Sequence, residues 1–204
     1  MVDLKKYIYI KDVLSKDERT LFFNYVKLFN EVNITNFEAK SLGETYSYGD
    51  MITDSLLISK KEKFEKAANL KFIETYSYWR LYKKFSSLRK HIDRPSCEIT
   101  VTVNVKSDIE WPIFIGGEKV LIKPGDGILY YGAKVEHWRE EYVGDYALQI
   151  FFHYIEENGK FIEYKYDKRE NLGTRKIWNL YGLVMHVKLF LTKMKESLLR
   201  KKEK

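Results

Sequence analysis

The residues best suited to chemistry in this sequence are two histidines and one aspartate. His91 and Asp93 form a His-Ile-Asp triplet, and His137 follows 44 residues after Asp93. In an extended segment, side chains two positions apart point the same way, so the imidazole and the carboxylate can reach one point. Two imidazoles and one carboxylate form the ligand set of non-haem Fe(II) sites, which leaves further coordination positions open. We therefore expect a metal site, formed where an early and a late strand become neighbours.

The other histidines and the single cysteine are weaker candidates. One cysteine, Cys97, excludes a disulfide scaffold and a cysteine-cluster zinc site, and it fits a reducing compartment. We expect Cys97 to be a small buried residue. His153 and His186 are expected to be core or surface residues rather than metal ligands.

Length and composition indicate one globular domain that would position such a site. The chain has 204 residues, 45% of them apolar, and its 16 Tyr, 12 Phe and 4 Trp are too many for a disordered chain. The N-terminal apolar run is too short for a signal peptide. No stretch reaches the roughly 20 apolar residues that a membrane-spanning helix needs, so no transmembrane segment is expected.

The net charge of +7 is concentrated near the C-terminus. Residues 1–164 hold 24 basic and 25 acidic residues, for a charge of −1, whereas residues 165–204 hold 12 and 4, for a charge of +8. Most of the chain therefore has no electrostatic reason to bind nucleic acid or an anionic membrane. Nucleic acid is not expected as a partner.

Helical patterns come first along the chain. A short strand at 7–10 precedes Ser15-Lys-Asp-Glu18, a capping-box pattern that predicts the start of a helix. Apolar residues then continue at helical spacing to Phe29. A second helix is predicted over 60–70.

Strand patterns follow after the second helix. Residues 73–82 are rich in strand-type side chains, and residues 97–106 alternate between apolar and polar, which predicts a half-buried strand. Further short strands are predicted at 113–115, 119–122, 127–131, 135–142, 146–154 and 161–166. Two helices before about eight strands predict a mainly β fold, a sandwich or barrel with helices on one face.

From about Thr174 the chain is again predicted to be helical. Apolar residues recur at alternating spacings of three and four from Ile177 to Leu198, and further apolar residues widen this face. We expect the helix to pack on the barrel. Dimerisation and a basic amphipathic surface helix are the alternatives.

The stretch from about residue 75 to 160 resembles the Fe(II)/2-oxoglutarate-dependent oxygenases, close to the prolyl 4-hydroxylase type of bacteria and their viruses. The resemblance is carried by TYSYWRLYKKFSSLRKHIDRPSCEITVTVNV, WPIFIGG and IKPGDGILYYGAKVEHWREEYVGDYALQIFFHYIEENGKF. The shared order is a tyrosine-bearing strand, His-x-Asp, a β-rich stretch, a Pro-Gly-Asp turn and a distal histidine. This resemblance implies a double-stranded β-helix (jelly-roll, cupin-like) core, with N-terminal helices packed on one sheet and a C-terminal helix.

The resemblance also implies roles for individual residues. His91 and Asp93 match the proximal metal ligands of the family, and His137 matches the distal ligand. Tyr82, nine residues before His91, matches the tyrosine that binds 2-oxoglutarate, because its hydroxyl can donate to a carboxylate. Asn104 falls at a position that contacts this co-substrate.

One departure concerns the basic residue that holds the far carboxylate of 2-oxoglutarate. The family places it on the final strand, about ten residues after the distal histidine, but residues 146–155 contain neither Arg nor Lys. We expect Arg139 to replace it, since it shares a strand face with His137 and a guanidinium binds carboxylates through two hydrogen bonds. Arg80 and Lys106 are the second choices. A surface salt bridge to a neighbouring glutamate is the alternative role for Arg139.

The resemblance implies a dioxygenase that hydroxylates a C–H bond. Such an enzyme uses Fe(II), 2-oxoglutarate and O₂ and releases succinate and CO₂, and ascorbate is expected to stimulate it. A peptidyl proline or another protein side chain is the expected substrate, with a small molecule as the alternative. A non-catalytic barrel that binds a partner through its basic C-terminal helix is the alternative from another class. We expect an oxygenase domain over 1–166, a helical extension over 167–204, and a cytoplasmic location in a bacterium or a virus-infected host cell.

Overall fold

The computed structural model describes residues 6–32 and 45–173. The predictions for the basic helical tail and for dimerisation through it lie outside these residues. In the described part, the strands are β1 (Ile8–Ile10), β2 (Thr45–Tyr48), β3 (Phe72–Lys83), β4 (Leu88–His91), β5 (Ile99–Ser107), β6 (Ile113–Ile115), β7 (Glu118–Val120), β8 (Gly127–Tyr130), β9 (His137–Arg139) and β10 (Tyr146–Glu156). The α-helices are α1 (Lys16–Val32) and α2 (Met51–Ala68), and the short 3₁₀ helices are η3 (Pro95–Cys97) and η4 (Ile162–Lys168).

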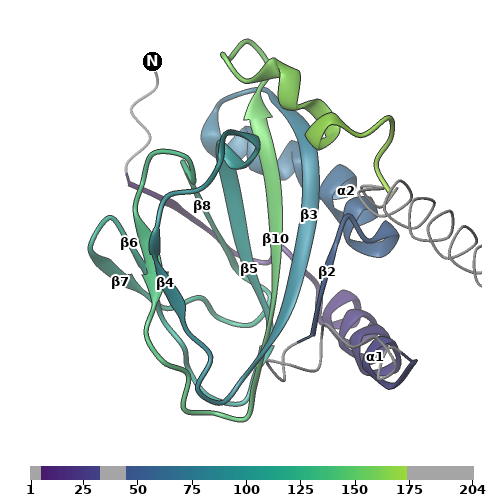
Figure 1. The fold of residues 1–204 in the computed structure, drawn as a ribbon, viewed down its shortest axis with the longest axis vertical. Helices are drawn as coiled ribbons and strands as arrows, with labels where there is room; N and C mark the ends of the chain where they lie inside the picture. Colours follow the sequence, from purple (N-terminus) through teal and green to yellow (C-terminus); the bar gives the residue numbers. More distant parts are fainter. Residues whose placement is uncertain (1–5, 33–44, 174–204) are drawn as a thin grey trace, which may run out of the picture. The chain divides into compact units, whose positions relative to one another are not determined.

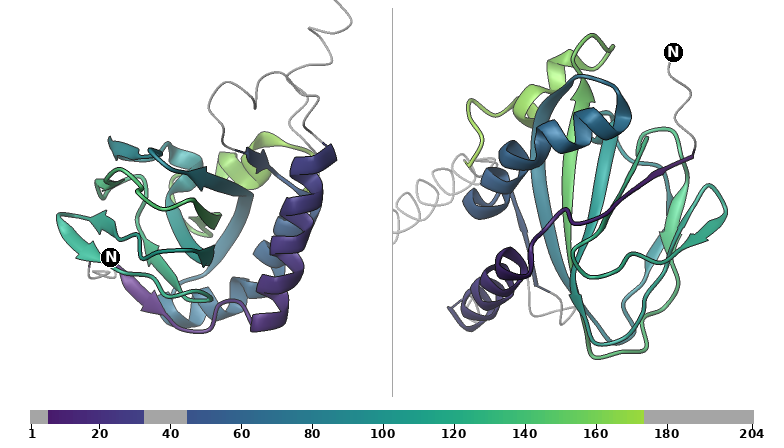
Figure 2. Two further views of the ribbon diagram at one scale, coloured as in Figure 1. Left: turned by 90° about the horizontal axis from the view of Figure 1, so that it is seen from below. Right: turned by 180° about the vertical axis from the view of Figure 1, so that it is seen from behind.

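Two antiparallel sheets form the body of the domain (Figure 1). One has six strands in the order β1-β8-β5-β10-β3-β2, and the other has four in the order β4-β9-β6-β7. Figure 2 shows α1 and α2 together on the side of the larger sheet that faces away from the smaller sheet. The mainly β fold with N-terminal helices packed on one sheet is therefore confirmed.

Both helices begin at capping residues. At α1, the Ser15 hydroxyl accepts from the Glu18 amide at 3.1 Å, and the Glu18 carboxylate accepts from the Ser15 amide at 2.8 Å, so the predicted capping box is present. Helix α2 begins nine residues earlier than the predicted Lys60, because the Asp50 carboxylate accepts from the Ile52 amide and caps it. The polar residues after Met51 hid this start in the sequence pattern.

The hydrophobic core lies between the helices and the larger sheet. Phe22 and Val26 of α1 and Leu57 and Phe64 of α2 pack on the outward-facing side chains of that sheet. Strand β5 was predicted to be half buried, but every residue from Ile99 to Val105 is buried. Its apolar residues face the helices and its polar residues face the space between the sheets, so both faces are covered.

Two predicted strands differ in the structure. In place of the strand predicted over 161–166, residues 162–168 form a 3₁₀ segment with left-handed backbone at Tyr166 and Asp167. The Asp167 carboxylate in this segment forms an ion pair with Arg94. The strand predicted over 135–142 is shorter, from His137 to Arg139. After Arg139 the chain leaves the sheet, and Tyr142 bonds through its backbone to Phe85 and Ser86.

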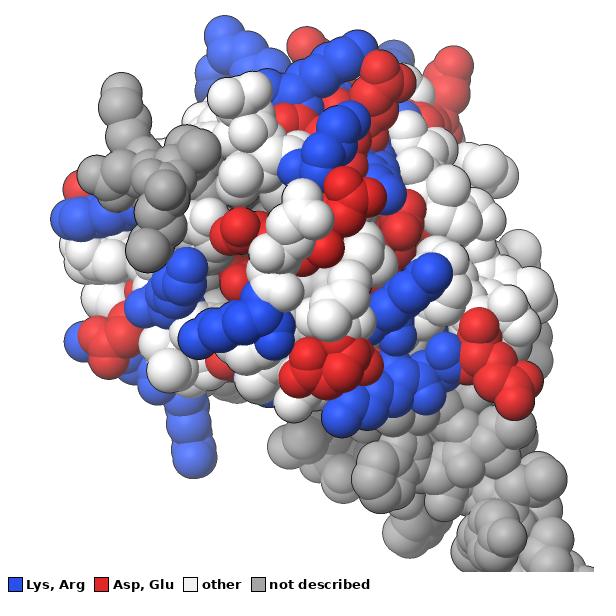
Figure 3. Space-filling model, turned by 90° about the horizontal axis from the view of Figure 1, so that it is seen from above, with Lys and Arg blue, Asp and Glu red and all other residues white. Residues whose placement is uncertain are grey.

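The charges of the described residues are mixed over the surface. On the face shown in Figure 3, basic and acidic side chains alternate rather than gather into one patch. In this part of the chain, no helix has both the length and the apolar character needed to cross a membrane.

The Asp108 carboxylate fastens the loop that leads into β10. It accepts hydrogen bonds from the Tyr142 hydroxyl and from the amides of Asp145 and Tyr146, the latter two at 2.7 and 3.0 Å. Burial opposes ionisation, but together these hydrogen bonds outweigh it and lower the pKa of Asp108 to about 2. A lowered pKa means that the ionised form stabilises the folded state above the unfolded pKa of about 4 and that this contribution is lost towards pH 2.

We therefore expect Asp108→Asn to lower the free energy of unfolding at pH 7, by less than about 1 kcal/mol because the carboxylate is exposed. The deficit relative to the wild type should shrink as the pH falls from 4 to 2. Urea unfolding at several pH values would measure it. A deficit that stays constant over this range would contradict the role of the carboxylate.

Candidate functional site

His91 and His137 face each other across a strand pair. His91 ends β4, His137 begins β9, and the two residues are direct partners in the antiparallel pairing of these strands. Asp93 follows two residues after His91, where its amide donates to the Gly132 carbonyl at 2.8 Å. The expected meeting of an early and a late strand is thus present, and it brings all three residues together.

The three side chains converge on one point. Asp93 Oδ1 lies 3.3 Å from His91 Nε2 and 3.6 Å from His137 Nε2, and the two imidazole centroids are 4.3 Å apart. One potential ligand atom from each residue lies within 4.8 Å of the others. This donor set fits a divalent metal ion, since one ion placed among the three atoms could contact all of them.

Hydrogen bonds fix the orientation of both imidazoles. His91 Nδ1 lies 2.7 Å from the Arg89 carbonyl oxygen, and His137 Nδ1 lies 3.0 Å from the Val135 carbonyl oxygen. A carbonyl can only accept, so each Nδ1 carries a proton, and in the neutral form of each ring Nε2 has a free lone pair directed at the shared point. The rings are therefore oriented for metal binding by their own strands.

The Asp93 carboxylate also receives a hydrogen bond from the larger sheet. Thr100 of β5 donates through its hydroxyl to Asp93 Oδ2 at 3.0 Å. This bond occupies one carboxylate oxygen and leaves Oδ1 towards the imidazoles. The arrangement favours a carboxylate that offers one oxygen to a metal.

The protonation states of the three residues are also suited to cation binding. Hydrogen bonding to Asp93 raises the pKa of His91, whereas burial lowers the pKa of His137. Burial favours the neutral acid at Asp93, but the hydrogen bond from His91 and the neighbouring imidazoles outweigh it and lower the pKa. The site therefore holds an ionised carboxylate beside a neutral, buried His137.

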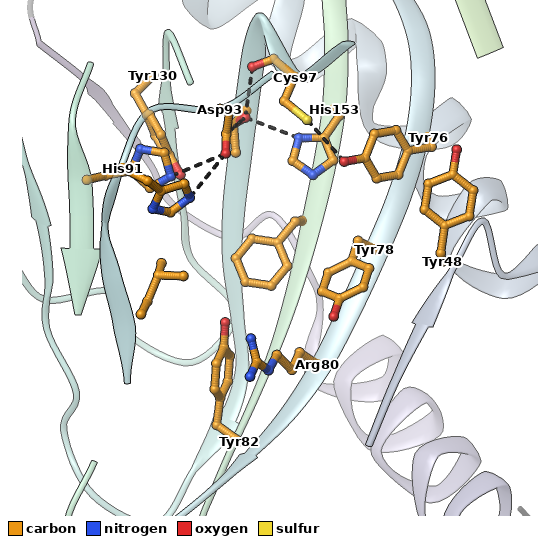
Figure 4. A pocket seen from close by; sticks show the side chains of 14 residues that line it. Tyr48, Tyr76, Tyr78, Arg80, Tyr82, His91, Asp93, Cys97, Tyr130 and His153 are labelled. Atoms are coloured by element: carbon orange, nitrogen blue, oxygen red, sulfur yellow. Dashed lines mark hydrogen bonds and ion pairs between the residues drawn. The ribbon is translucent and has the colours of Figure 1, made fainter. Parts of the chain in front are cut away.

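These residues stand on the wall of a cavity of about 270 Å³ (Figure 4). Alternate residues of β3 form one side of it, because side chains two apart share a strand face. The lining residues are Tyr48, Tyr76, Tyr78, Arg80, Tyr82, Leu88, His91, Asp93, Cys97, Thr100, Tyr130, His137, Phe151 and His153. The sequence contains a signal for this wall, the run of tyrosines at period two in β3, of which only Tyr82 was predicted to contact a ligand.

Among the basic candidates, Arg80 lines the cavity together with Tyr82. Its guanidinium carbon lies 4.6 Å from the centre of the Tyr82 ring, and Figure 4 shows both residues at the end of the cavity away from the histidines. In the pairing of β3 with β10, Arg80 is the direct partner of Gln149. Lys106, by contrast, lies over the Phe23 ring of α1, so it is on the outer side of the sheet.

Arg139 is not among the residues that line the cavity, contrary to expectation. It is buried to 2% exposure, donates to the Trp111 carbonyl oxygen, and lies 3.4 Å from Gln149 Oε1. No carboxylate among the described residues pairs with it, and its burial does not fit the alternative role in a surface salt bridge. Burial lowers its pKa to about 10, which leaves a buried cation 4.7 Å from the centre of the Trp111 ring.

Asn104 is also set back from the cavity. Its side-chain amide donates to the Ile122 carbonyl at 2.9 Å and accepts from Gln149 Nε2 at 3.2 Å. Gln149 in turn lies against Arg139. Asn104 therefore belongs to a buried series of hydrogen-bonded side chains and does not contact the main cavity. The resemblance placed Asn104 on the right strand but could not show these partners.

His153 and Cys97 are buried, as expected, but both line the cavity. His153 Nδ1 lies 3.1 Å from the Thr100 hydroxyl, and Cys97 Sγ lies 3.0 Å from the Tyr76 hydroxyl. Burial lowers the pKa of His153 to about 4 and raises that of Cys97 to about 12, so both are neutral near pH 7.

Comparisons with known proteins support the fold. No family model and no curated protein sequence matches this chain. Solved structures do match: HygX from Streptomyces hygroscopicus with nickel and 2-oxoglutarate bound has a TM-score of 0.60 at 14% identity, over 74% of this chain and 83% of that one. A Pseudomonas putida prolyl-4-hydroxylase gives 0.59 at 12% identity, over 76% and 94%.

A third match is the viral collagen prolyl hydroxylase of Paramecium bursaria Chlorella virus-1 in complex with 2-oxoglutarate. It has a TM-score of 0.56 at 15% identity, over 74% of this chain and 97% of that one. The chain therefore has the fold of these 2-oxoglutarate enzymes, and the double-stranded β-helix expected from the sequence is confirmed.

Gly132 is packed directly against the candidate metal site. A Cβ atom there would overlap Asp93 Oδ2 and would lie 2.5 Å from Thr100 Oγ1 and 2.6 Å from the Cys97 carbonyl oxygen. We expect Gly132→Ala to displace the Asp93 carboxylate and weaken Co(II) binding by about 10- to 100-fold. Calorimetric titration of the metal-free protein would measure the affinity.

Gly117→Ala is the matched control. No atom lies within 4 Å of a Cβ at Gly117, but its φ of +88° makes alanine unfavourable. This variant should lose about 1 kcal/mol of stability without losing metal affinity. Equal metal affinity in the two variants would show that Gly132 does not support the site.

Proposed function

We propose that this protein is a non-haem Fe(II)- and 2-oxoglutarate-dependent dioxygenase that hydroxylates a C–H bond. The observation that carries the proposal is the convergence of His91, Asp93 and His137 on one point in the wall of a cavity. This donor set is typical of non-haem Fe(II) oxygenases. The shared fold with proteins that bind 2-oxoglutarate supports the same assignment.

In this proposal, His91, Asp93 and His137 hold the iron. Bound iron with 2-oxoglutarate and O₂ supplies the oxidising chemistry, in which 2-oxoglutarate becomes succinate and CO₂ and one oxygen atom enters the substrate C–H bond. The residues of the chain orient the ligands and exclude water. The carbonyls of Arg89 and Val135 and the Thr100 hydroxyl fix the ligand orientations.

We propose Arg80, with Tyr82, as the pair that binds the far carboxylate of 2-oxoglutarate. Both line the cavity at the end away from the histidines, and a guanidinium and a phenol both donate to carboxylate oxygens. Phe151 and Leu88 also line the cavity, where apolar side chains exclude water. Arg139 lies over the Trp111 ring, which packs on Tyr82, so its charge adds positive potential near this end of the cavity.

For the substrate, we propose a protein side chain, with peptidyl proline first. Two of the similar structures are prolyl hydroxylases, one of them a collagen prolyl hydroxylase. Ascorbate is expected to stimulate such an enzyme by keeping the iron reduced. The near balance of charge in residues 1–164 gives no support for a nucleic-acid substrate.

The test is stepwise addition of Fe(II) and then 2-oxoglutarate to the metal-free protein without oxygen. We expect a weak visible absorption band from the iron-bound keto acid in the wild type and no band in His91→Ala, which lacks a ligand. Circular dichroism should show that His91→Ala remains folded. Iron binding without a band would reject 2-oxoglutarate as co-substrate, and failure to bind iron would favour a non-catalytic binding protein.

Two arginine variants separate the candidates for the carboxylate-binding residue. We expect Arg80→Met to weaken 2-oxoglutarate binding, read from the same band, by about 10- to 100-fold, as loss of a charge-assisted hydrogen bond predicts. Arg139→Met should weaken it less, because Arg139 does not reach the cavity. Lys106→Met is the control without effect; a larger loss in Arg139→Met than in Arg80→Met would reverse the assignment.

A further inference from the structure

The two ends of the cavity differ in chemistry, and the proposed co-substrate uses only one of them. Tyr76, Tyr78, Arg80 and Tyr82 follow one another along the cavity face of β3, each about 7 Å from the next. Arg80 and Tyr82 lie at one end, and Tyr76 lies near Tyr48 at the other (Figure 4). We call the residues Tyr48, Tyr76, Tyr78, Cys97 and His153 the tyrosine end.

Aromatic rings from three adjacent strands make a continuous wall at the tyrosine end. The ring centroids of Tyr48 in β2 and Tyr76 in β3 are 4.6 Å apart, and those of Tyr76 and His153 in β10 are 4.5 Å apart. In the next row, the Tyr78 and Phe151 centroids are 5.9 Å apart. The wall therefore runs from the outermost strand of the sheet to the candidate metal site.

Two of the phenol hydroxyls at this end already have partners in the protein. The Tyr48 hydroxyl donates to the Asp167 carboxylate, and the Tyr76 hydroxyl lies 3.0 Å from Cys97 Sγ. These hydroxyls are engaged with the protein, so Tyr48 and Tyr76 offer mainly ring carbon to a bound group. Such surfaces attract C–H groups by burial and by contact with the ring faces.

The ionic residues beside this wall all have partners of opposite charge. Arg94 donates two hydrogen bonds of 2.9 Å each to the buried Asp167 carboxylate, and its guanidinium carbon lies 4.9 Å from the centre of the Tyr76 ring. Arg169, which lies over the Tyr48 ring, pairs with Asp54, and Asp93, close to Cys97 and His153, is a candidate ligand of the metal ion that would balance its charge. A charged group bound here would lose its hydration without gaining an unpaired counter-ion.

We propose that the tyrosine end is the substrate subsite and that it takes an uncharged hydrocarbon group, aliphatic or a saturated ring, rather than an ammonium or carboxylate group. This inference rests on the function proposed above, which assigns the opposite end to 2-oxoglutarate. Cys97 and His153 of this end lie close to Asp93, so a group on the wall is next to the candidate iron position. Tyr46, which is 49% exposed and packs on Tyr78, extends the same aromatic wall to the surface.

The experiment uses three probes that share one ring: cyclohexanol, cyclohexylammonium and cyclohexanecarboxylate. Each is titrated into the full-length protein with Fe(II) and saturating 2-oxoglutarate, without oxygen, while the visible band is recorded. We expect cyclohexanol to shift the band and to bind at least about 10-fold more tightly than either charged probe. No response to cyclohexanol, or equal binding of a charged probe, would overturn the subsite.

Variants of the ion pair test whether neutrality is the cause. Asp167→Asn leaves Arg94 beside Tyr76 without its carboxylate partner. The affinity for cyclohexanecarboxylate should then rise at least about 10-fold relative to the affinity for cyclohexanol. Arg94→Gln should instead favour cyclohexylammonium, and the double variant Arg94→Gln/Asp167→Asn should restore the preference for cyclohexanol. Glu118→Gln, which removes an exposed ion pair with Lys6, is the control without effect.

Circular dichroism establishes that each variant is folded, and the wild-type ranking stands as a test even if Asp167→Asn fails to fold. Unchanged probe ranking in folded Asp167→Asn and Arg94→Gln would reject the charge argument. Formation of the band before any probe is added tests the proposed function separately. Absence of the band would overturn both proposals, whereas a band with the wrong probe ranking would overturn only the subsite.

Discussion

The pairing of His91 with His137 across β4 and β9 is the contact on which the site depends. It sets two imidazoles side by side, and each ring is oriented by a carbonyl two residues before it in its own chain segment. Asp93 is then held from the other sheet, through Thr100 of β5. The three side chains thus join the two sheets, and the site forms only where both layers are in place.

The sequence contained the local signals for much of this arrangement. The capping box of α1, the strand character of β3 and the His-x-Asp triplet are short-range patterns, and the structure contains each of them. The meeting of His137 with this triplet was also expected, because a late strand beside an early strand is usual in a jelly roll.

What the sequence did not reveal depends on neighbours from distant segments. The polar face of β5 looks like a solvent-facing surface in the sequence, but the smaller sheet covers it. Arg139 shares a strand face with His137, yet Trp111 and Gln149 hold it behind the cavity. Residues 161–166 alternate like a strand, but they lie in a 3₁₀ segment whose Asp167 pairs with Arg94, a partner distant in the sequence.

The segment after β10 does not line the cavity, but it supports the residues that do. Asp167 holds the Tyr48 hydroxyl, and Arg169 forms a buried ion pair with Asp54 of α2, so residues up to Gly173 belong with the core rather than with an extension that begins at 167. The groups that would hold iron come from β4, β9 and the loop between β4 and β5. If the tyrosine end is the substrate subsite that we propose, its charge balance depends on Asp167, far in the chain from the metal ligands. Substitutions in this later stretch would then change which compounds the cavity admits while His91, Asp93 and His137 stay as they are.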